Sequence, residues 1–194
     1  MVKRTNPFAQ YAHPESTLAK RVKYVENQVR NNRAEMKFRT WVMPTGALPT
    51  GSVEVRDLTA ISQGNSVDTR EGNHIKVWRV EVRGDISAGL SCYLLQARDG
   101  SAPVFADFSS TNAGSFLTTA ANNTSLVEWN YHRPVPGITG VPVPLRFSRK
   151  FKGLKVSYPS TTSTPNTNGL YVVILNNSGS TLSNNLSMRI WFTE

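Results

Sequence analysis

The sequence predicts an all-β domain, a sandwich or jelly roll, preceded by a basic N-terminal arm that is partly helical. Three observations favour this fold class. Short runs of alternating apolar and polar residues fill the chain after Trp41, loops of Pro, Ser, Thr, Asn and Gly separate these runs, and no convincing helical periodicity follows. Because the crossover helices of parallel sheets are missing, a parallel α/β fold is excluded.

The first element is an amphipathic helix, expected over about residues 15–38. Leu18, Val22, Val25 and Val29 recur at helical intervals and form one apolar stripe. This stripe is the candidate surface for self-association of arms, with the basic side facing phosphates. Two alternatives remain: a terminal helix docked on the body with solvated charges, or a membrane-surface helix, which the narrow, Val-rich stripe disfavours.

The arm holds most of the positive charge. The chain has 22 Lys and Arg, 13 Asp and Glu, and a formal net charge of +9, and residues 1–43 contribute nine of the basic and three of the acidic side chains. A charge asymmetry of this kind is typical of a polyanion-binding tail. The candidate nucleic-acid-binding residues are Lys3, Arg4, Lys20, Arg21, Lys23, Arg30, Arg33, Lys37 and Arg39. Lys20, Arg21 and Lys23 also match a nuclear-import patch, although many basic tetrapeptides do.

Residues 44–52, rich in Pro and Gly, are expected to form a linker, and residues 53–194 the β-domain. Strands are expected at 53–61, 75–86, 90–97, 104–108, 126–131, 143–151, 154–158, 170–176 and 186–192. In the second, Ile75 and Val77 alternate in one phase and Trp78, Val80 and Val82 in the other, which predicts a bulge or a bend near Val77. In the last, Leu186, Met188, Ile190 and Phe192 are expected to face inward.

The sequence does not favour an enzyme. A single Cys92 excludes a disulfide scaffold or cysteine-zinc module, and the three histidines accompany no nucleophile motif. No phosphate-binding loop occurs, so no cofactor is expected. The carboxylates are scattered, which leaves a divalent cation between subunits as an open alternative. The side chains of Arg79, Glu81, Arg83 and Asp85 alternate in charge, and this pattern indicates either a solvated sheet face or a subunit contact.

Membrane insertion is not expected, because the longest apolar run spans only residues 170–175 and no signal-peptide pattern lies in the first thirty residues. We therefore expect a soluble protein that is intracellular where it is made.

Several short motifs follow one another in an order that resembles a known family. They are Leu58-x-x-Ile61-x-Gln63-Gly64, Arg70-Glu71-Gly72-Asn73-x-Ile75, Val80-x-Val82-Arg83-Gly84-x-Ile86, Gly169-Leu170-Tyr171-Val172-Val173 and the terminal Arg189-Ile190-Trp191-Phe192. This layout is similar to that of single jelly-roll capsid proteins of small icosahedral viruses. The satellite necrosis virus coat proteins and the capsid proteins of circular, Rep-encoding single-stranded DNA viruses are the members it resembles.

The resemblance implies an eight-stranded antiparallel jelly roll, a 60-subunit shell, and an arm turned inward to a single-stranded genome. Sixty arms would then bring about 360 positive charges to the genome. The dense arginine-rich arm of many circular-DNA virus capsids is absent, so DNA and RNA both remain open, as do the host and its receptor. The implied location is the virion, with assembly in the host nucleus or cytoplasm. One alternative is a cellular nucleic-acid-binding β-domain with a basic helical extension. A second is a carbohydrate-binding or hydrolytic jelly roll, although the sequence shows no cluster of aromatic platforms or paired carboxylates.

Overall fold

The computed structural model describes residues 20–22, 35–66, 68–108, 125–132 and 140–194. The chain divides into two compact units, Met1–Glu35 and Met36–Glu194. In the first unit, residues 20–22 are helical and exposed, which agrees with the predicted helix at these three positions. The remainder of that predicted helix up to residue 34 lies outside the described residues. No helix in the described part is long and apolar enough to cross a membrane.

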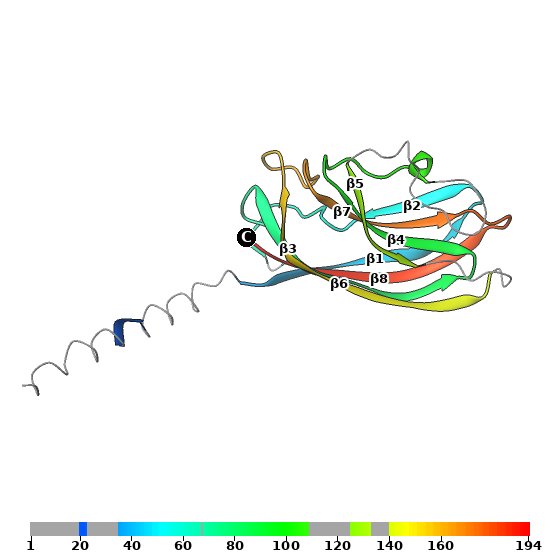
Figure 1. Cartoon of the computed structure of the whole chain (residues 1–194), viewed down its shortest axis with the longest axis horizontal. Coiled ribbons are helices and arrows are strands. Elements are labelled where there is room, and N and C mark those ends of the chain that lie inside the picture. The colour runs from blue at the N-terminus through cyan, green and yellow to red at the C-terminus, as the bar shows by residue number, and fades with distance from the viewer. Residues whose placement is uncertain (1–19, 23–34, 67, 109–124, 133–139) are drawn as a thin grey trace, which may run out of the picture. The chain divides into compact units, whose positions relative to one another are not determined.

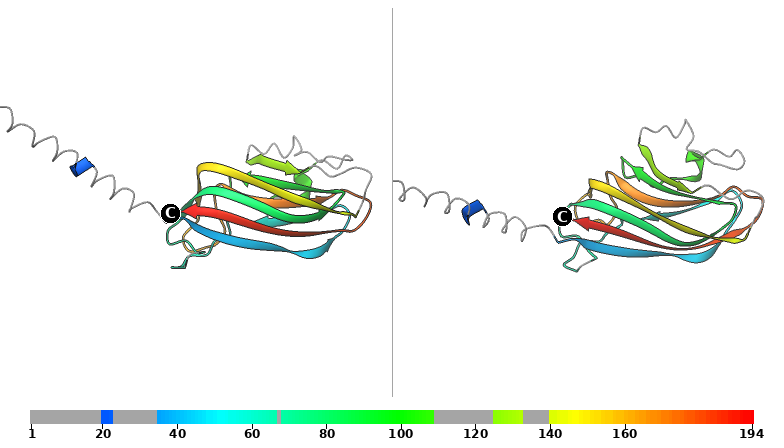
Figure 2. Two further views of the ribbon diagram at one scale, coloured as in Figure 1. Left: turned by 90° about the horizontal axis from the view of Figure 1, so that it is seen from below. Right: turned by 60° about the horizontal axis from the view of Figure 1, so that its bottom comes forward.

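The described residues of the second unit form two antiparallel sheets of four strands each (Figure 1). The strands are β1 (Lys37–Leu48), β2 (Ser52–Asp57), β3 (His74–Ser87), β4 (Leu90–Ala97), β5 (Leu126–His132), β6 (Pro142–Ser157), β7 (Gly169–Asn176) and β8 (Leu182–Thr193). One sheet has the order β1-β8-β3-β6 and the other β2-β7-β4-β5. The sheets lie face to face as a sandwich (Figure 2).

The strand order defines the topology. Each connection crosses from one sheet to the other, except that β4 is followed by its neighbour β5 in the same sheet. Strands distant in sequence, such as β1 and β8, therefore pair directly. Two four-stranded sheets connected in this way form a jelly roll, which confirms the predicted all-β fold class.

The core lies between the sheets, and the two outer faces differ. Along β8, buried and exposed residues alternate, and Leu186, Met188, Ile190 and Phe192 are fully buried as predicted. Strands β4 and β7 are instead buried on both faces. On their outer side Tyr93 packs against Phe108, with ring centroids 5.1 Å apart. The β1-β8-β3-β6 sheet, by contrast, keeps exposed polar side chains on its outer face.

The predicted bulge in the second run is confirmed in β3. The register against both neighbouring strands shifts between Val77 and Arg79, so that Ile75, Val77, Val80 and Val82 are all buried. The prediction that Trp78 shares the phase of Val80 does not describe its environment, because Trp78 occupies the bulge and is 37% exposed.

The predicted boundary between arm and body is wrong in its details. Strand β1 begins at Lys37, inside the predicted helix and arm, and runs to Leu48 through half of the predicted linker 44–52. Period-two alternation explains the strand, because Trp41 and Met43 face inward while Thr40 and Val42 are exposed. A register shift between Met43 and Gly46 creates a bulge at the sheet edge, where a proline is tolerated.

Two further strand predictions need correction. Residues 105–107 form a short 3₁₀ helix instead of the strand predicted at 104–108. The strands predicted at 143–151 and 154–158 are one strand, β6, which bends at Gly153 with φ of +77°. A glycine there adopts the positive φ without the steric cost that a side chain would add.

Arg70, the first residue of the Arg70-Glu71-Gly72-Asn73 motif, holds two loops of the body together. The side chain is fully buried and donates to the backbone carbonyls of Ile61, Gly72, Ser160 and Thr162. Its guanidinium also lies 4.1 Å from the centroid of the Tyr158 ring. Arg70 therefore connects the loop after β2 to the loop after β6.

Candidate nucleic-acid interface

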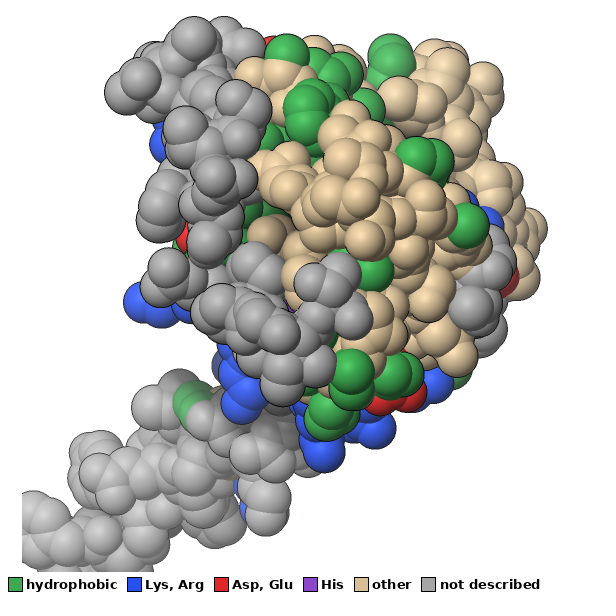
Figure 3. Space-filling view, turned by 90° about the vertical axis from the view of Figure 1, so that its right-hand side faces the viewer, with side chains coloured by type: hydrophobic (Ala, Val, Ile, Leu, Met, Phe, Trp, Pro, Cys, Tyr) green, Lys and Arg blue, Asp and Glu red, His purple; other side chains and the backbone are tan. Residues whose placement is uncertain are grey.

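The outer side of the β1-β8-β3-β6 sheet carries a surface that we call the basic face. Its twelve residues are Phe38, Thr40 and Val42 of β1, Ser187, Arg189 and Trp191 of β8, Arg79, Glu81 and Arg83 of β3, and Arg146, Ser148 and Lys150 of β6. Five of them are cationic and one is acidic. In an end-on view, Lys and Arg side chains gather along the lower border of the body (Figure 3), which is the side of this sheet.

The sheet register arranges the face in three rows across the four strands. Phe38, Trp191, Arg79 and Lys150 form one row; Thr40, Arg189, Glu81 and Ser148 the next; and Val42, Ser187, Arg83 and Arg146 the third. Since residues in register lie about 4.5–5.5 Å apart across neighbouring strands, each cation has a polar or aromatic neighbour in its row or the adjacent one.

Glu81 lies at the centre of an arginine cluster. Its carboxylate accepts a 2.6 Å hydrogen bond from Arg83 Nε and lies 3.6 Å from Arg79 and 3.9 Å from Arg146. The Arg83 hydrogen bond and the nearby positive charges hold the pKa of Glu81 below its usual value. One carboxylate thus orients three guanidiniums whose total charge it only partly neutralises. The excess positive charge is available for an anion.

Polar and aromatic side chains of the face also hold Arg79 and Arg189. Arg79 Nε donates to Ser148 Oγ at 2.9 Å and Arg189 Nε to Thr40 Oγ1 at 3.1 Å. Both guanidiniums also flank the Trp191 ring, at 4.9 Å and 5.7 Å from its centroid. Beside them a hollow of about 150 Å³ is lined by Glu81, Arg83, Ser187 and Arg189. This arrangement suits a phosphate group, which accepts hydrogen bonds from several arginines at once.

Two exposed aromatic side chains accompany the cations. Phe38 of the basic face is 44% exposed. Trp78, in the bulge of β3, is also exposed on the outer side of the sheet, and its Nε1 donates a 3.0 Å hydrogen bond to Thr193 Oγ1. Proteins that bind single-stranded nucleic acids combine aromatic rings, on which the bases stack, with cations that contact the phosphates.

The site residues predicted from the sequence fall into three groups: some lie in the short helical segment, some lie outside the described residues, and two belong to β1. Lys20 and Arg21 are exposed in the short helical segment, and so is Val22 of the predicted self-association stripe. Lys3, Arg4, Lys23, Arg30 and Arg33, with Leu18, Val25 and Val29, lie outside the described residues. Lys37 and Arg39 belong to β1 rather than to an arm helix.

Lys37 and Arg39 both have contacts within the body. Lys37 Nζ lies 3.0 Å from carboxylate oxygens of Glu71 and of Glu194, and its side chain is 11% exposed. Arg39 is half-buried with its guanidinium 4.1 Å from the Trp41 centroid. These contacts tie the first strand to its surroundings, and the two carboxylates leave little of the Lys37 charge for a phosphate.

The cations of the basic face were not among the predicted site residues. The sequence marks Arg79, Glu81 and Arg83 only as an alternating charge pattern and Arg189 only as part of a family motif, and it assigns Arg146 and Lys150 no role in binding. Three of the cations directly follow a buried apolar residue: Arg83 follows Val82, Arg146 follows Leu145 and Arg189 follows Met188. That signal identifies an outer face, but only the register shows that the cations of three strands meet.

The titratable groups in the described part of the chain do not assemble into a metal site. No cluster of three or more His, Cys, Asp or Glu side chains that could hold a metal ion occurs there. Partial burial lowers the pKa of His132 and raises that of Glu128, and complete burial raises the pKa of Cys92 to about 12.

The fold and face define a β-sandwich of jelly-roll topology with one basic sheet surface. No family model and no curated protein matches the chain. Among solved structures it has weak similarity to VP1 of Trichodysplasia spinulosa-associated polyomavirus, in complex with GM1 oligosaccharide. The two chains are 10% identical, the alignment covers 82% of this chain and 77% of VP1, and the TM-score is 0.15. The function proposed below draws no support from a similarity this weak.

Proposed function

We propose that this protein is a viral capsid subunit that assembles into a small icosahedral shell of sixty copies and packages a single-stranded nucleic acid. The observation that carries the proposal is the basic face, built across the β1-β8-β3-β6 sheet of a jelly roll. The family motifs of the sequence support the same function. The role of the chain is structural, and its location is the virion.

Nucleic acid is bound at two places in this proposal. The basic residues of the arm contact phosphates irrespective of sequence, while the apolar stripe of Leu18, Val22, Val25 and Val29 brings arms together. The basic face provides Arg79, Arg83, Arg146, Lys150 and Arg189 as further phosphate contacts. Trp78 and Phe38 provide aromatic surfaces for bases.

Assembly is tested by electron microscopy of the purified full-length protein, together with sequencing of nuclease-protected nucleic acid. Uniform particles containing protected nucleic acid are expected. A monomer or dimer that persists across salt and pH, and binds one defined nucleic-acid site, would instead identify the cellular nucleic-acid-binding alternative.

Truncation tests the arm separately from the body. A chain lacking residues 1–35 keeps all of β1 and should fold but package less nucleic acid. A chain lacking residues 1–43 also loses more than half of β1 and should be destabilised. Full packaging by the shorter truncation would refute the role of the arm.

The basic face is tested by salt dependence. In the double variant Arg83→Gln, Arg146→Gln, two phosphate contacts are lost. Because each contact on a single strand contributes about 0.7 to the slope of log affinity against log salt concentration, the slope should decrease by about 1.4. Arg98→Gln is the control, because Arg98 is exposed and follows β4 of the other sheet. An unchanged slope in the double variant would exclude these arginines from the interface.

A further inference from the structure

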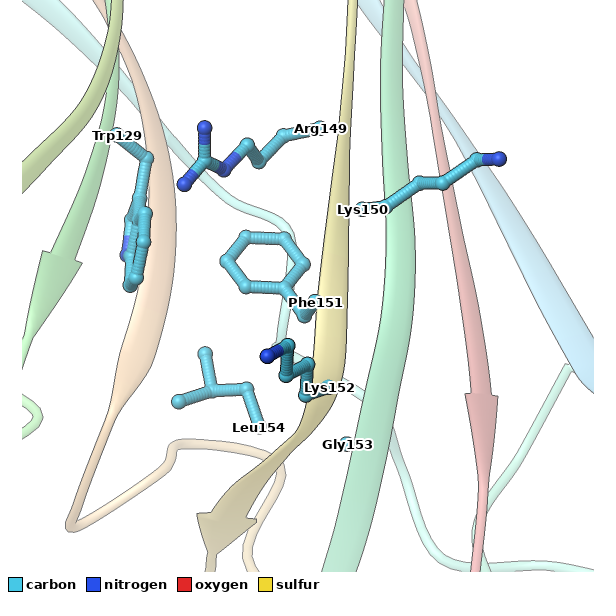
Figure 4. Close-up of a pocket in the computed structure, with 7 residues that line it drawn as sticks. All are labelled: Trp129, Arg149, Lys150, Phe151, Lys152, Gly153 and Leu154. Carbon is cyan, nitrogen blue, oxygen red and sulfur yellow. The ribbon is translucent and has the colours of Figure 1, made fainter.

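A second pocket opens at the edge of the sandwich, between β5 and β6. Its volume is about 410 Å³, and it is lined by Trp129 of β5 and by Arg149, Lys150, Phe151, Lys152, Gly153 and Leu154 of β6 (Figure 4). Sites for small molecules commonly have volumes of roughly 300–1,000 Å³. The pocket is therefore large enough for a ligand the size of a nucleotide.

The walls of the pocket are aromatic and held in place. The Trp129 and Phe151 rings meet edge to face, with centroids 5.2 Å apart and planes at 82°. Trp129 Nε1 donates to Gln96 Oε1 at 2.9 Å, Gln96 Nε2 to Asn168 Oδ1 at 2.8 Å, and Asn168 Nδ2 to the Lys155 carbonyl at 2.8 Å. This chain of hydrogen bonds runs from β5 through β4 to β6. It fixes the indole before any ligand arrives.

The rim of the pocket is cationic. Arg149 lies with its guanidinium 4.7 Å from the Trp129 centroid, and Lys150 and Lys152 flank Phe151 along β6. Figure 4 shows Arg149 and Phe151 on the side of β6 that faces Trp129, whereas Lys150 points to the opposite side. The described lining residues include no carboxylate. The charge and the walls together complement a ligand that joins a flat aromatic ring to an anion.

We propose that this pocket binds one nucleotide, with its base against Trp129 and Phe151 and its phosphate near Arg149 and Lys152. A nucleotide of the packaged strand and a free nucleotide have the same chemistry, and the first source rests on the proposed function. Lys150 borders the pocket on β6, but its side chain points to the side of the basic face. A strand bound on the face therefore reaches the pocket by passing around the edge formed by β6.

Photo-crosslinking tests the strand as the source. The full-length protein is mixed with single-stranded oligonucleotides containing 5-iodouracil, irradiated, digested and analysed by mass spectrometry. Crosslinks at Trp129 or Phe151 are expected. Crosslinks confined to Trp78, Trp191 or Phe38 would overturn the pocket inference for a bound strand and leave the proposed function standing. Absence of oligonucleotide binding would count against the proposed function, and the free-nucleotide titration then decides the pocket.

Calorimetric titration tests the free nucleotide. Adenosine monophosphate should bind at least tenfold more tightly than adenosine, which lacks the phosphate, and than inorganic phosphate, which lacks the base. It should also bind at least tenfold more tightly than laurate, an anion with an alkyl chain in place of the ring. Lys152→Gln should weaken this binding several-fold, whereas Lys76→Gln, on an exposed part of β3 outside the pocket, should leave it unchanged. Trp129→Phe should weaken it as well, and Lys152→Gln provides the test if that variant does not fold. No nucleotide binding together with no crosslink in the pocket, or preferred binding of laurate, would overturn the inference.

Discussion

The replacement Arg70→Lys should strongly destabilise the body, because a buried guanidinium holds two loops together. Arg70 donates hydrogen bonds to four backbone carbonyls and contacts the Tyr158 ring, and no solvent reaches it. Lysine retains the charge, but its single nitrogen cannot reach carbonyls on both sides of the planar guanidinium site.

The magnitude follows from the contacts that lysine loses. If the ammonium keeps two of the four hydrogen bonds, the two that are lost cost about 1.5 kcal/mol each, since the donor is charged. Loss of the guanidinium–ring contact adds about 1 kcal/mol. The free energy of unfolding should therefore fall by about 4 kcal/mol, which lowers the melting temperature by roughly 8–16 °C in a domain of this size.

Urea unfolding of dissociated subunits, followed by circular dichroism, measures the change. Arg146→Lys is the matched control, because the Arg146 side chain is 73% exposed. Its free energy of unfolding should stay within about 0.5 kcal/mol of the unmodified protein. A loss below about 1 kcal/mol in Arg70→Lys would refute the reasoning, because it would mean that the four carbonyls find other partners at little cost.

Three further predictions concern β3, Glu81 and Cys92. Gly84→Ala should abolish soluble folded protein, because a Cβ at φ of +142° would lie 2.0 Å from the Asn185 carbonyl oxygen, while Gly72→Ala, with open space, should fold normally in the same expression test. Because the folded pKa of Glu81 is lowered, its contribution to stability is present above the unfolded pKa of about 4.3 and is lost as pH falls through the folded pKa. The destabilisation by Glu81→Gln, measured by urea unfolding, should accordingly shrink between pH 6 and pH 3; a constant difference would contradict the ion cluster. Cys92, fully buried with a pKa raised to about 12, should resist iodoacetamide until the protein is denatured, and rapid labelling of the folded protein would contradict its burial.

Local alternation was sufficient to predict much of the body. The terminal strand and the bulge near Val77 could be predicted because each depends on which neighbouring residues are apolar, and that pattern is local. Strand β1 was misinterpreted for the opposite reason. Its Pro44 and Gly46 have the composition of a linker, and only pairing with β8 on one side, with a bulge between Met43 and Gly46, makes them part of a strand.

The basic face could not be predicted because it depends on register. Arg79 is in register with Lys150 of β6 and Trp191 of β8, which are far away in the sequence. No local pattern indicates that these three side chains share a row. The candidate site therefore includes a sheet surface in addition to the arm that the sequence indicates.

The same alternation that builds the core also separates stability from binding along each strand. Val82 is fully buried against the core, whereas Arg83, the next residue, is on the basic face and its side chain is 56% exposed. Truncating Val82 removes buried apolar contacts and acts on folding. Arg83→Gln removes a surface cation, which acts on phosphate contacts, and its stability cost is limited to the hydrogen bond to Glu81. Since the two outer faces of the sandwich differ, this independence is greatest on the β1-β8-β3-β6 sheet. On the other sheet, where Tyr93 and Val173 of the outer side are themselves buried, substitution of either face disturbs the fold.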